Sequence, residues 1–184
     1  MPTHRHSPAV FTYNQWLMVA GGHDGSVLFG NDLAAVDLET DNHQWLSVTL
    51  LPVKCCHVTT TIVQNKLYLI GGTLDETLVG NFPDIIHSST SATTKTWHTL
   101  PAPPLEWSAA ITIHGALIAV GGCHGNMDGT AIYVYQPATN DWQIGNLPCP
   151  RAPCSCILLP SGELLVAGGL DSNGKLTRVD VAVM

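Results

Sequence analysis

Four pairs of adjacent glycines recur along the chain at a nearly constant distance. The pairs are Gly21-Gly22, Gly71-Gly72, Gly121-Gly122 and Gly168-Gly169, so successive pairs are 50, 50 and 47 residues apart. Each pair follows a short apolar run, which reads WLMVA, LYLI, ALIAV or ELLVA. A fixed period of this length is typical of repeat proteins, in which similar units stack on their neighbours and share one continuous core.

A tryptophan follows each of the first three glycine pairs. These are Trp45, Trp97 and Trp142. The segments between the markers are short, rich in β-branched and apolar residues, and separated by turn residues, so they read as strands. In the second period the expected strands are 57–63, 67–72, 84–89 and 96–100, and in the third 109–113, 117–122, 130–135 and 142–145. Tight turns are expected at Gln64-Asn65 and His114-Gly115.

Four strands in each period, with very little helix, indicate a β-propeller. The two markers have physical roles in that fold. Glycines let backbones crowd together and permit positive φ, whereas a tryptophan gives each blade a large apolar plate for packing on its neighbour. We therefore expect the eight paired glycines and the three tryptophans to be structural.

Three segments carry a family resemblance. Residues 65–72 (NKLYLIGG), 133–142 (YVYQPATNDW) and the proline-bearing linkers at 100–103 and 147–148 resemble the kelch repeat. The resemblance implies an all-β, kelch-type propeller of the galactose-oxidase-like superfamily, with repeat units at about 7–52, 53–104, 105–150 and 151–184. That amounts to three blades and three strands of a fourth, about 3.75 blades. Segments 35–38 and 84–89 depart from the pattern, because they lack its tyrosine.

An incomplete ring exposes the faces of its terminal blades. We expect the chain to be a piece of a longer polypeptide that supplies the missing blades. The alternative is a ring closed by another copy of the chain.

In an antiparallel blade, the loops between the second and third strands lie on the same face as the linkers between blades, and loops on a rigid scaffold commonly bind partners. Residues 73–81 form one of the expected loops between a second and a third strand. The resemblance implies a protein or peptide partner on this face. Many kelch propellers bind their partner as the substrate receptor of a ubiquitin-ligase adaptor, although no BTB or BACK segment is visible in this sequence. The candidate contacts are His23, Asp24, Lys54, Trp107, His124, Asn126, Arg151, Asp171 and Asn173. The alternatives to partner binding are that Trp107 packs inside a junction between blades and that the histidines only hydrogen-bond to the backbone.

Other classes of function fit less well. The 14 acids against 7 Lys and Arg give a formal charge of −7, which disfavours nucleic acid. Apolar runs of about six residues are too short to span a membrane, and without a signal peptide we expect a cytoplasmic protein with reduced cysteines. Cys55-Cys56-His57 and Cys154-Ser155-Cys156 lack the spacing of a zinc knuckle, so we expect no metal or other cofactor. A copper-oxidase-like or epimerase-like enzyme fragment is the alternative, but no catalytic set can be assigned.

Overall fold

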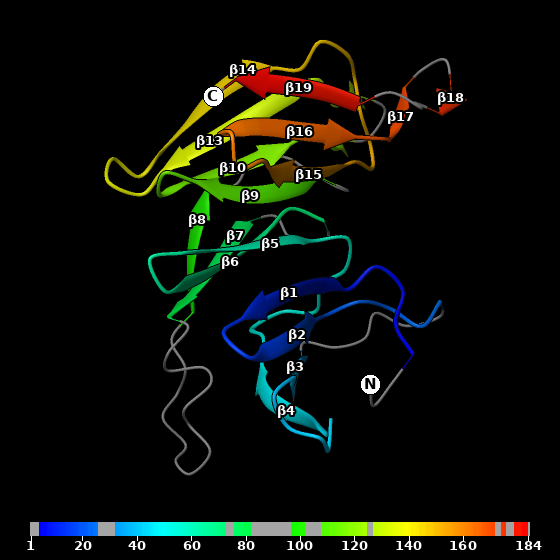
Figure 1. The fold of residues 1–184 in the computed structure, drawn as a ribbon, viewed down its shortest axis with the longest axis vertical. Coiled ribbons are helices and arrows are strands. Elements are labelled where there is room, and N and C mark those ends of the chain that lie inside the picture. Colours follow the sequence, from blue (N-terminus) through cyan, green and yellow to red (C-terminus); the bar gives the residue numbers. More distant parts are fainter. Residues whose placement is uncertain are drawn as a thin grey trace.

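The computed structural model describes residues 4–25, 32–72, 76–81, 97–101, 108–124, 127–171, 174–175 and 179–183. Within these ranges the chain is all-β, and no helix there is long and apolar enough to cross a bilayer. Four antiparallel sheets follow one another along an arc, as expected for kelch-type blades (Figure 1). Neighbouring sheets meet along their first strands.

Each of the first three sheets has four strands in sequential order, and the described part of the fourth has three. The first sheet comprises β1 (Ala9–Tyr13), β2 (Trp16–Ala20), β3 (Asp32–Asp37) and β4 (Trp45–Leu50), and the second β5 (Thr59–Val63), β6 (Lys66–Ile70), β7 (Glu76–Asn81) and β8 (Trp97–Pro101). The third sheet comprises β9 (Ala109–Ile113), β10 (Ala116–Val120), β13 (Ala131–Gln136) and β14 (Asp141–Asn146), and the fourth β15 (Ser155–Leu158), β16 (Glu163–Ala167) and β19 (Val179–Val183).

The tight turns lie where the sequence predicts them. Gln64 and Asn65 have φ values of 49° and 60°, and His114 and Gly115 have 49° and 79°. Two successive positive φ angles define the hairpin turn that matches the right-handed twist of the flanking strands. These turns join the first and second strands of their sheets.

The third strand of the second sheet was predicted at the wrong place. It is β7, over residues 76–81, whereas the sequence indicated 84–89 and assigned 73–81 to a loop. Residues 84–89 lie outside the described part of the chain. The run Thr77-Leu78-Val79 has strand composition, but its nearness to the glycine pair favoured a loop.

Two of the loops between second and third strands contain short ribbons. In the third repeat β11 (Cys123–His124) pairs with β12 (Met127–Asp128), and in the fourth β17 (Leu170–Asp171) pairs with β18 (Gly174–Lys175). The sequence indicated irregular loops at both places. Backbone pairing within these segments satisfies N–H and C=O groups that a loop would leave to water.

The core lies between the sheets. One apolar cluster joins the first two sheets and includes Trp97, a second joins the second and third and includes Trp142, and a third joins the third and fourth. Each of these two tryptophans lies on the last strand of its sheet and packs toward the preceding sheet, as the expected inter-blade plate does. Trp45 is half-buried and faces away from the second sheet.

The paired glycines let each sheet approach the linker of the next sheet. The Gly22 amide donates to the Cys55 carbonyl and the Gly122 amide to the Arg151 carbonyl, both at 2.8 Å. A Cβ built on Gly21 would lie 2.3 Å from the Cys55 oxygen, and one on Gly121 would lie 2.6 Å from that of Arg151. Since φ is also positive at all eight paired glycines, other residues would be strained at each of them, and at Gly21 and Gly121 they would be crowded as well.

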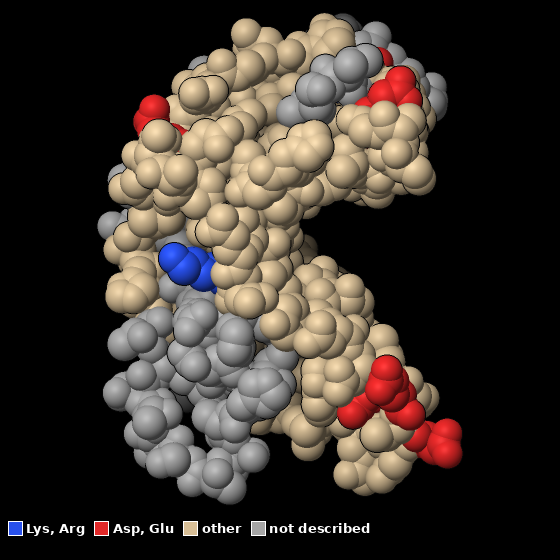
Figure 2. Space-filling view, turned by 60° about the vertical axis from the view of Figure 1, so that its left-hand side comes forward, with Lys and Arg blue, Asp and Glu red and all other residues tan. Residues whose placement is uncertain are grey.

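The four sheets form an open arc. Figure 2 shows a C-shaped outline with a deep recess between its two ends. Among the described residues on the side seen there, few are charged, in keeping with a composition of only 11% charged residues.

Candidate partner-binding face

The linkers between sheets and the loops that follow the glycine pairs lie on one face of the arc, which we call the loop face. His6, in the linker before β1, pairs with His23, and Ala152, in the linker before β15, pairs with Leu170. The hairpin turns at Gln64-Asn65 and His114-Gly115 lie at the other ends of the same strands. The arrangement expected from strand alternation is therefore present.

A cavity of about 400 Å³ opens where the four linkers converge. Its walls come from residues that immediately precede the first strand of each sheet, namely Ser7, Pro8, His57, Val58, Ser108, Pro153 and Cys154. A second cavity of about 280 Å³ continues between β1, β5, β9 and β15, the strands nearest the centre of the arc. The first cavity is thus the loop-face mouth of a central channel.

The mouth combines apolar walls with a few polar groups. Pro8, Val58 and Pro153 supply apolar surface, while the hydroxyls of Ser7 and Ser108 and the imidazole of His57 supply polar groups. Concave sites that bind ligands have this composition, with few polar groups fixing orientation among apolar walls. The linkers before all four sheets contribute to the mouth, and each supplies one or two residues.

Three histidines lie in a row beside the mouth. The rings of His6 and His23 are stacked with centroids 5.6 Å apart, and those of His23 and His57 are also 5.6 Å apart. His23 Nδ1 accepts a hydrogen bond of 3.1 Å from the Gly25 amide, which places the proton of neutral His23 on Nε2. His23 therefore hydrogen-bonds to the backbone, which is the alternative to partner binding that the sequence left open. Among the residues that the structure describes, no three His, Cys, Asp or Glu side chains are arranged to hold a metal ion.

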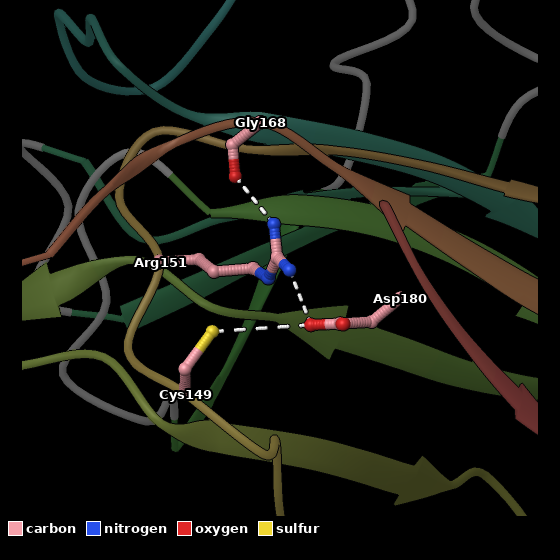
Figure 3. A network of polar contacts seen from close by, with 4 residues as sticks. All are labelled: Cys149, Arg151, Gly168 and Asp180. Carbon is pink, nitrogen blue, oxygen red and sulfur yellow. Dashed lines mark hydrogen bonds and ion pairs between the residues drawn. The ribbon is translucent and has the colours of Figure 1, made fainter. Parts of the chain in front are cut away.

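Arg151 requires a correction. The sequence indicated an exposed residue available to a partner, but its side chain is 0% exposed. Figure 3 shows its guanidinium donating to the Gly168 carbonyl at 2.7 Å and pairing with Asp180, whose carboxylate also accepts from the Cys149 thiol at 3.8 Å. Arg151 therefore fastens its linker to the fourth sheet.

Arg5 makes the same kind of contact in the first sheet. Its guanidinium donates to the Gly21 carbonyl at 3.0 Å and pairs with Asp32 at 2.5 Å. In both repeats the arginine lies four residues before the first residue of the first strand, and the aspartate lies at or near the start of the third strand. This shared spacing is the signal in the sequence by which the structural pair could have been predicted.

The remaining candidates are placed only in part. Asp24 and Lys54 are exposed on the loop face, and His23 is half-buried there. His124 belongs to β11 and Asp171 to β17, but their side chains are not described. Trp107, Asn126 and Asn173 lie outside the described residues.

A family model described as the KLHDC2/KLHL20/DRC7 Kelch-repeats domain matches residues 1–169. That match covers most of the chain, and the four-sheet arc agrees with it. The chain belongs to the kelch-repeat family. The search of curated proteins gave no match. Kelch domains are generally non-catalytic propeller modules that bind protein partners, so the family supports an interaction role.

The buried thiols of this kelch domain are poor nucleophiles. Burial raises the pKa of Cys55 and of Cys156 to about 12, and the neighbouring thiols Cys56 and Cys154 add to the respective shifts. Burial also raises the pKa of Cys154, against a smaller lowering by a backbone hydrogen bond and by Arg151. Since the thiolate is the reactive form, these cysteines serve packing between kelch blades.

Proposed function

We propose that the chain binds a protein or peptide partner on its loop face, anchored at the mouth of the central channel. The observation that carries the proposal is the cavity of about 400 Å³ to which all four sheets contribute. A volume of this size accommodates a few side chains of a bound segment. The kelch family supports the class of partner, since its domains generally bind proteins.

The chemistry of the face suggests how a partner would be held. Apolar groups of the partner would enter between Pro8, Val58 and Pro153, where water is displaced from apolar walls. Ser7, Ser108 and His57 would orient polar groups, and the exposed ammonium of Lys54 would add an electrostatic contact at the rim. The mechanism is surface complementarity without a chemical step.

A matched pair of lysines tests the proposal. Lys54 is exposed on the loop face, whereas Lys66 is exposed at the start of β6, beside the hairpin turn at the opposite end of the same sheet. Wild type, Lys54→Glu and Lys66→Glu would be immobilised separately, and the proteins retained from a cell extract would be quantified by mass spectrometry. We expect a set of proteins depleted by Lys54→Glu and retained by Lys66→Glu.

A third variant, Ser108→Tyr, places a larger side chain in the mouth and should deplete the same set. Chemical unfolding would establish that each variant is folded. Equal retention by all three variants and wild type would contradict the proposal. Substrate recognition in a ubiquitin ligase is a narrower form of the same proposal, and ligase subunits among the depleted proteins would support it.

A further inference from the structure

We propose that the three histidines beside the channel mouth, His6, His23 and His57, make the junction of the first two sheets sensitive to pH, so that it loosens between pH 7.5 and pH 5.5. The inference rests on the proposed function only for its consequence, which is that a partner held at the mouth leaves as the pH falls. The loosening itself is a property of the chain without a partner.

Backbone hydrogen bonds hold two linkers and the loop after β2 together at this junction. His6 and His23 exchange both of their backbone bonds, at 2.6 and 2.9 Å, which joins the linker before β1 to the loop. The His57 amide donates to the Ser7 carbonyl at 3.0 Å, which joins the linker before β5 to the linker before β1. The three imidazoles therefore come from three segments whose positions depend on one another.

The fold does not require histidine at the positions of His6 and His23. In the fourth repeat Ala152 and Leu170 form the same backbone pair, with both bonds made. Ala152 precedes its first strand by the same number of residues as His6 does, and Leu170 follows its glycine pair directly, as His23 does. Neither of these apolar side chains takes up a proton. The pairing of linker and loop is thus common to both repeats, whereas the two imidazoles belong to the first.

His23 holds its loop in a way that only the neutral ring allows. Its Nδ1 accepts a hydrogen bond of 3.1 Å from the amide of Gly25, two residues further on, as the side chains of Asn and Asp do in turns. An imidazolium carries hydrogens on both nitrogens. Protonation of His23 would therefore set one N–H against another, break this bond and release the ring from the loop.

The neighbouring rings oppose a second and a third positive charge. The ring centroids of His6 and His57 each lie 5.6 Å from that of His23, close enough for like charges to disfavour each other. At pH 5.5 a histidine in water is mostly protonated, since its ordinary pKa is about 6.5. Acid therefore favours separation of the rings, and separation pulls on the backbone bonds that join their three segments.

Charged side chains near the three rings do not reverse this effect. Arg5 pairs with Asp32 at the start of β3, so these two charges neutralise each other. Asp24 is exposed, and water weakens its attraction for a nearby imidazolium. The exposed ammonium of Lys54, in the linker before β5, acts in the opposite direction.

The other titratable groups on the described parts of these segments are one histidine and two thiols. His4 is exposed. Burial keeps the Cys55 thiol neutral, with a pKa of about 12, and the Cys56 sulfur lies 3.2 Å from His57 Nδ1. Across the mouth, burial also raises the pKa of the Cys154 thiol. Neutral thiols do not compensate positive charge on the three rings.

Backbone protection at the junction tests the proposal on the chain without a partner. Hydrogen exchange of single amides would be measured at pH 7.5 and pH 5.5, and each rate compared with that of an unstructured peptide at the same pH. We expect protection of the His6, His23 and His57 amides to fall about fivefold or more at the lower pH, the factor that loss of one ordinary hydrogen bond produces. The Gly122 amide, which bonds the linker before β15, should keep its protection.

Two variants and a control separate the histidines from other effects of acid. His23→Asn keeps an acceptor for the Gly25 amide but takes up no proton, and the double variant His6→Ala with His23→Leu gives the first repeat the side chains of the fourth. Both should show the same protection at the two pH values. His114→Asn is the control, because His114 is exposed at the opposite hairpin turn, and it should behave as wild type does. Unchanged protection in wild type, or an equal fall in wild type and His23→Asn, would overturn the proposal.

Partner retention is a separate readout. Proteins that depend on Lys54 for retention at pH 7.5 should elute from immobilised wild type at pH 5.5 and stay on immobilised His23→Asn. Elution that is equal from both would overturn the link between pH and partner binding. A junction that loosens with acid while no protein depends on Lys54 would contradict the proposed function and support the pH dependence alone.

Discussion

The Gly122 amide donates a hydrogen bond of 2.8 Å to the Arg151 carbonyl, and this bond joins the third sheet to the linker of the fourth. The same bond joins Gly22 to Cys55 between the first two sheets. The repeated glycine pair is thus the point at which one repeat holds the next. The regular spacing of the glycine pairs in the sequence therefore follows from this contact between successive repeats.

Gly121→Ala tests the close approach. Its φ is +66°, and its Cβ would lie 2.6 Å from the Arg151 oxygen and 2.9 Å from the Cys154 sulfur. We expect a loss of at least about 3 kcal/mol in the free energy of unfolding by urea, from strain and crowding together. Gly115→Ala is the control, because φ is +79° there but nothing lies within 4 Å. It should cost only about 1–2 kcal/mol, and equal losses would contradict the account.

Trp142→Ala tests the inter-blade plate. Trp142 packs with Tyr135, whose ring centroid is 5.1 Å away, at the junction of the second and third sheets. Truncation of a large aromatic side chain should lower the free energy of unfolding by about 3–5 kcal/mol. Trp142→Phe keeps an aromatic plate and should cost less than half as much. A loss below about 1 kcal/mol for Trp142→Ala would show that the ring does not hold the junction.

Asp180→Asn tests the buried ion pair. Removing the carboxylate leaves the Arg151 charge buried without its counter-ion, and we expect a loss of about 3 kcal/mol in stability. The double variant Arg151→Met with Asp180→Leu replaces the pair by apolar groups and should recover most of that loss. A double variant less stable than Asp180→Asn alone would show that Arg151 acts mainly through its bond to Gly168.

Alkaline pH should destabilise the fold. The thiols of Cys55 and Cys156 have a pKa of about 12 when folded, against an ordinary value of 9.0 for a thiol in water. Above pH 9 the unfolded chain therefore releases protons that the folded chain retains, so the free energy of unfolding falls as pH rises. Burial raises the pKa of Tyr68 and Tyr135 as well, which acts in the same direction.

Urea titrations at pH 7.5 and pH 10.5 measure this dependence. The double variant Cys55→Ala with Cys156→Ala should show a smaller fall between the two pH values than wild type does. Equal falls would mean that the two thiols titrate alike in the folded and unfolded chains.

The features best predicted from the sequence are those that every repeat needs. Gly121 and Trp142 were identified because crowding at a linker and packing at a junction demand the same residue type once per period. The turn at Gln64-Asn65 was identified because the turn geometry favours such residues. The fold class follows from these residues together, whereas the family was identified from the resemblance of segments such as 65–72 and 133–142 to the kelch repeat.

The features missed do not recur at the same place in every repeat. Arg151 was interpreted as a surface charge because each of the two paired arginines lies 27 or 29 residues from its aspartate in the sequence. The strand at 76–81 was missed because local strand propensity is weaker than the pattern of the neighbouring repeats. Gly129 was not singled out, although a Cβ there would lie 1.4 Å from the Gly122 oxygen. The channel mouth is assembled from four distant linkers, so only the folded chain shows it.

Hydrogen–deuterium exchange with and without a partner recovered on the immobilised chain tests the central claim most directly. The account predicts slowed exchange at the loop-face linkers, residues 54–58 and 151–154, which approach the channel mouth. Exchange at the opposite turns, residues 64–65 and 114–115, should be unchanged. Slowed exchange at those turns with no change in the linkers would place the partner on the opposite face and contradict the account.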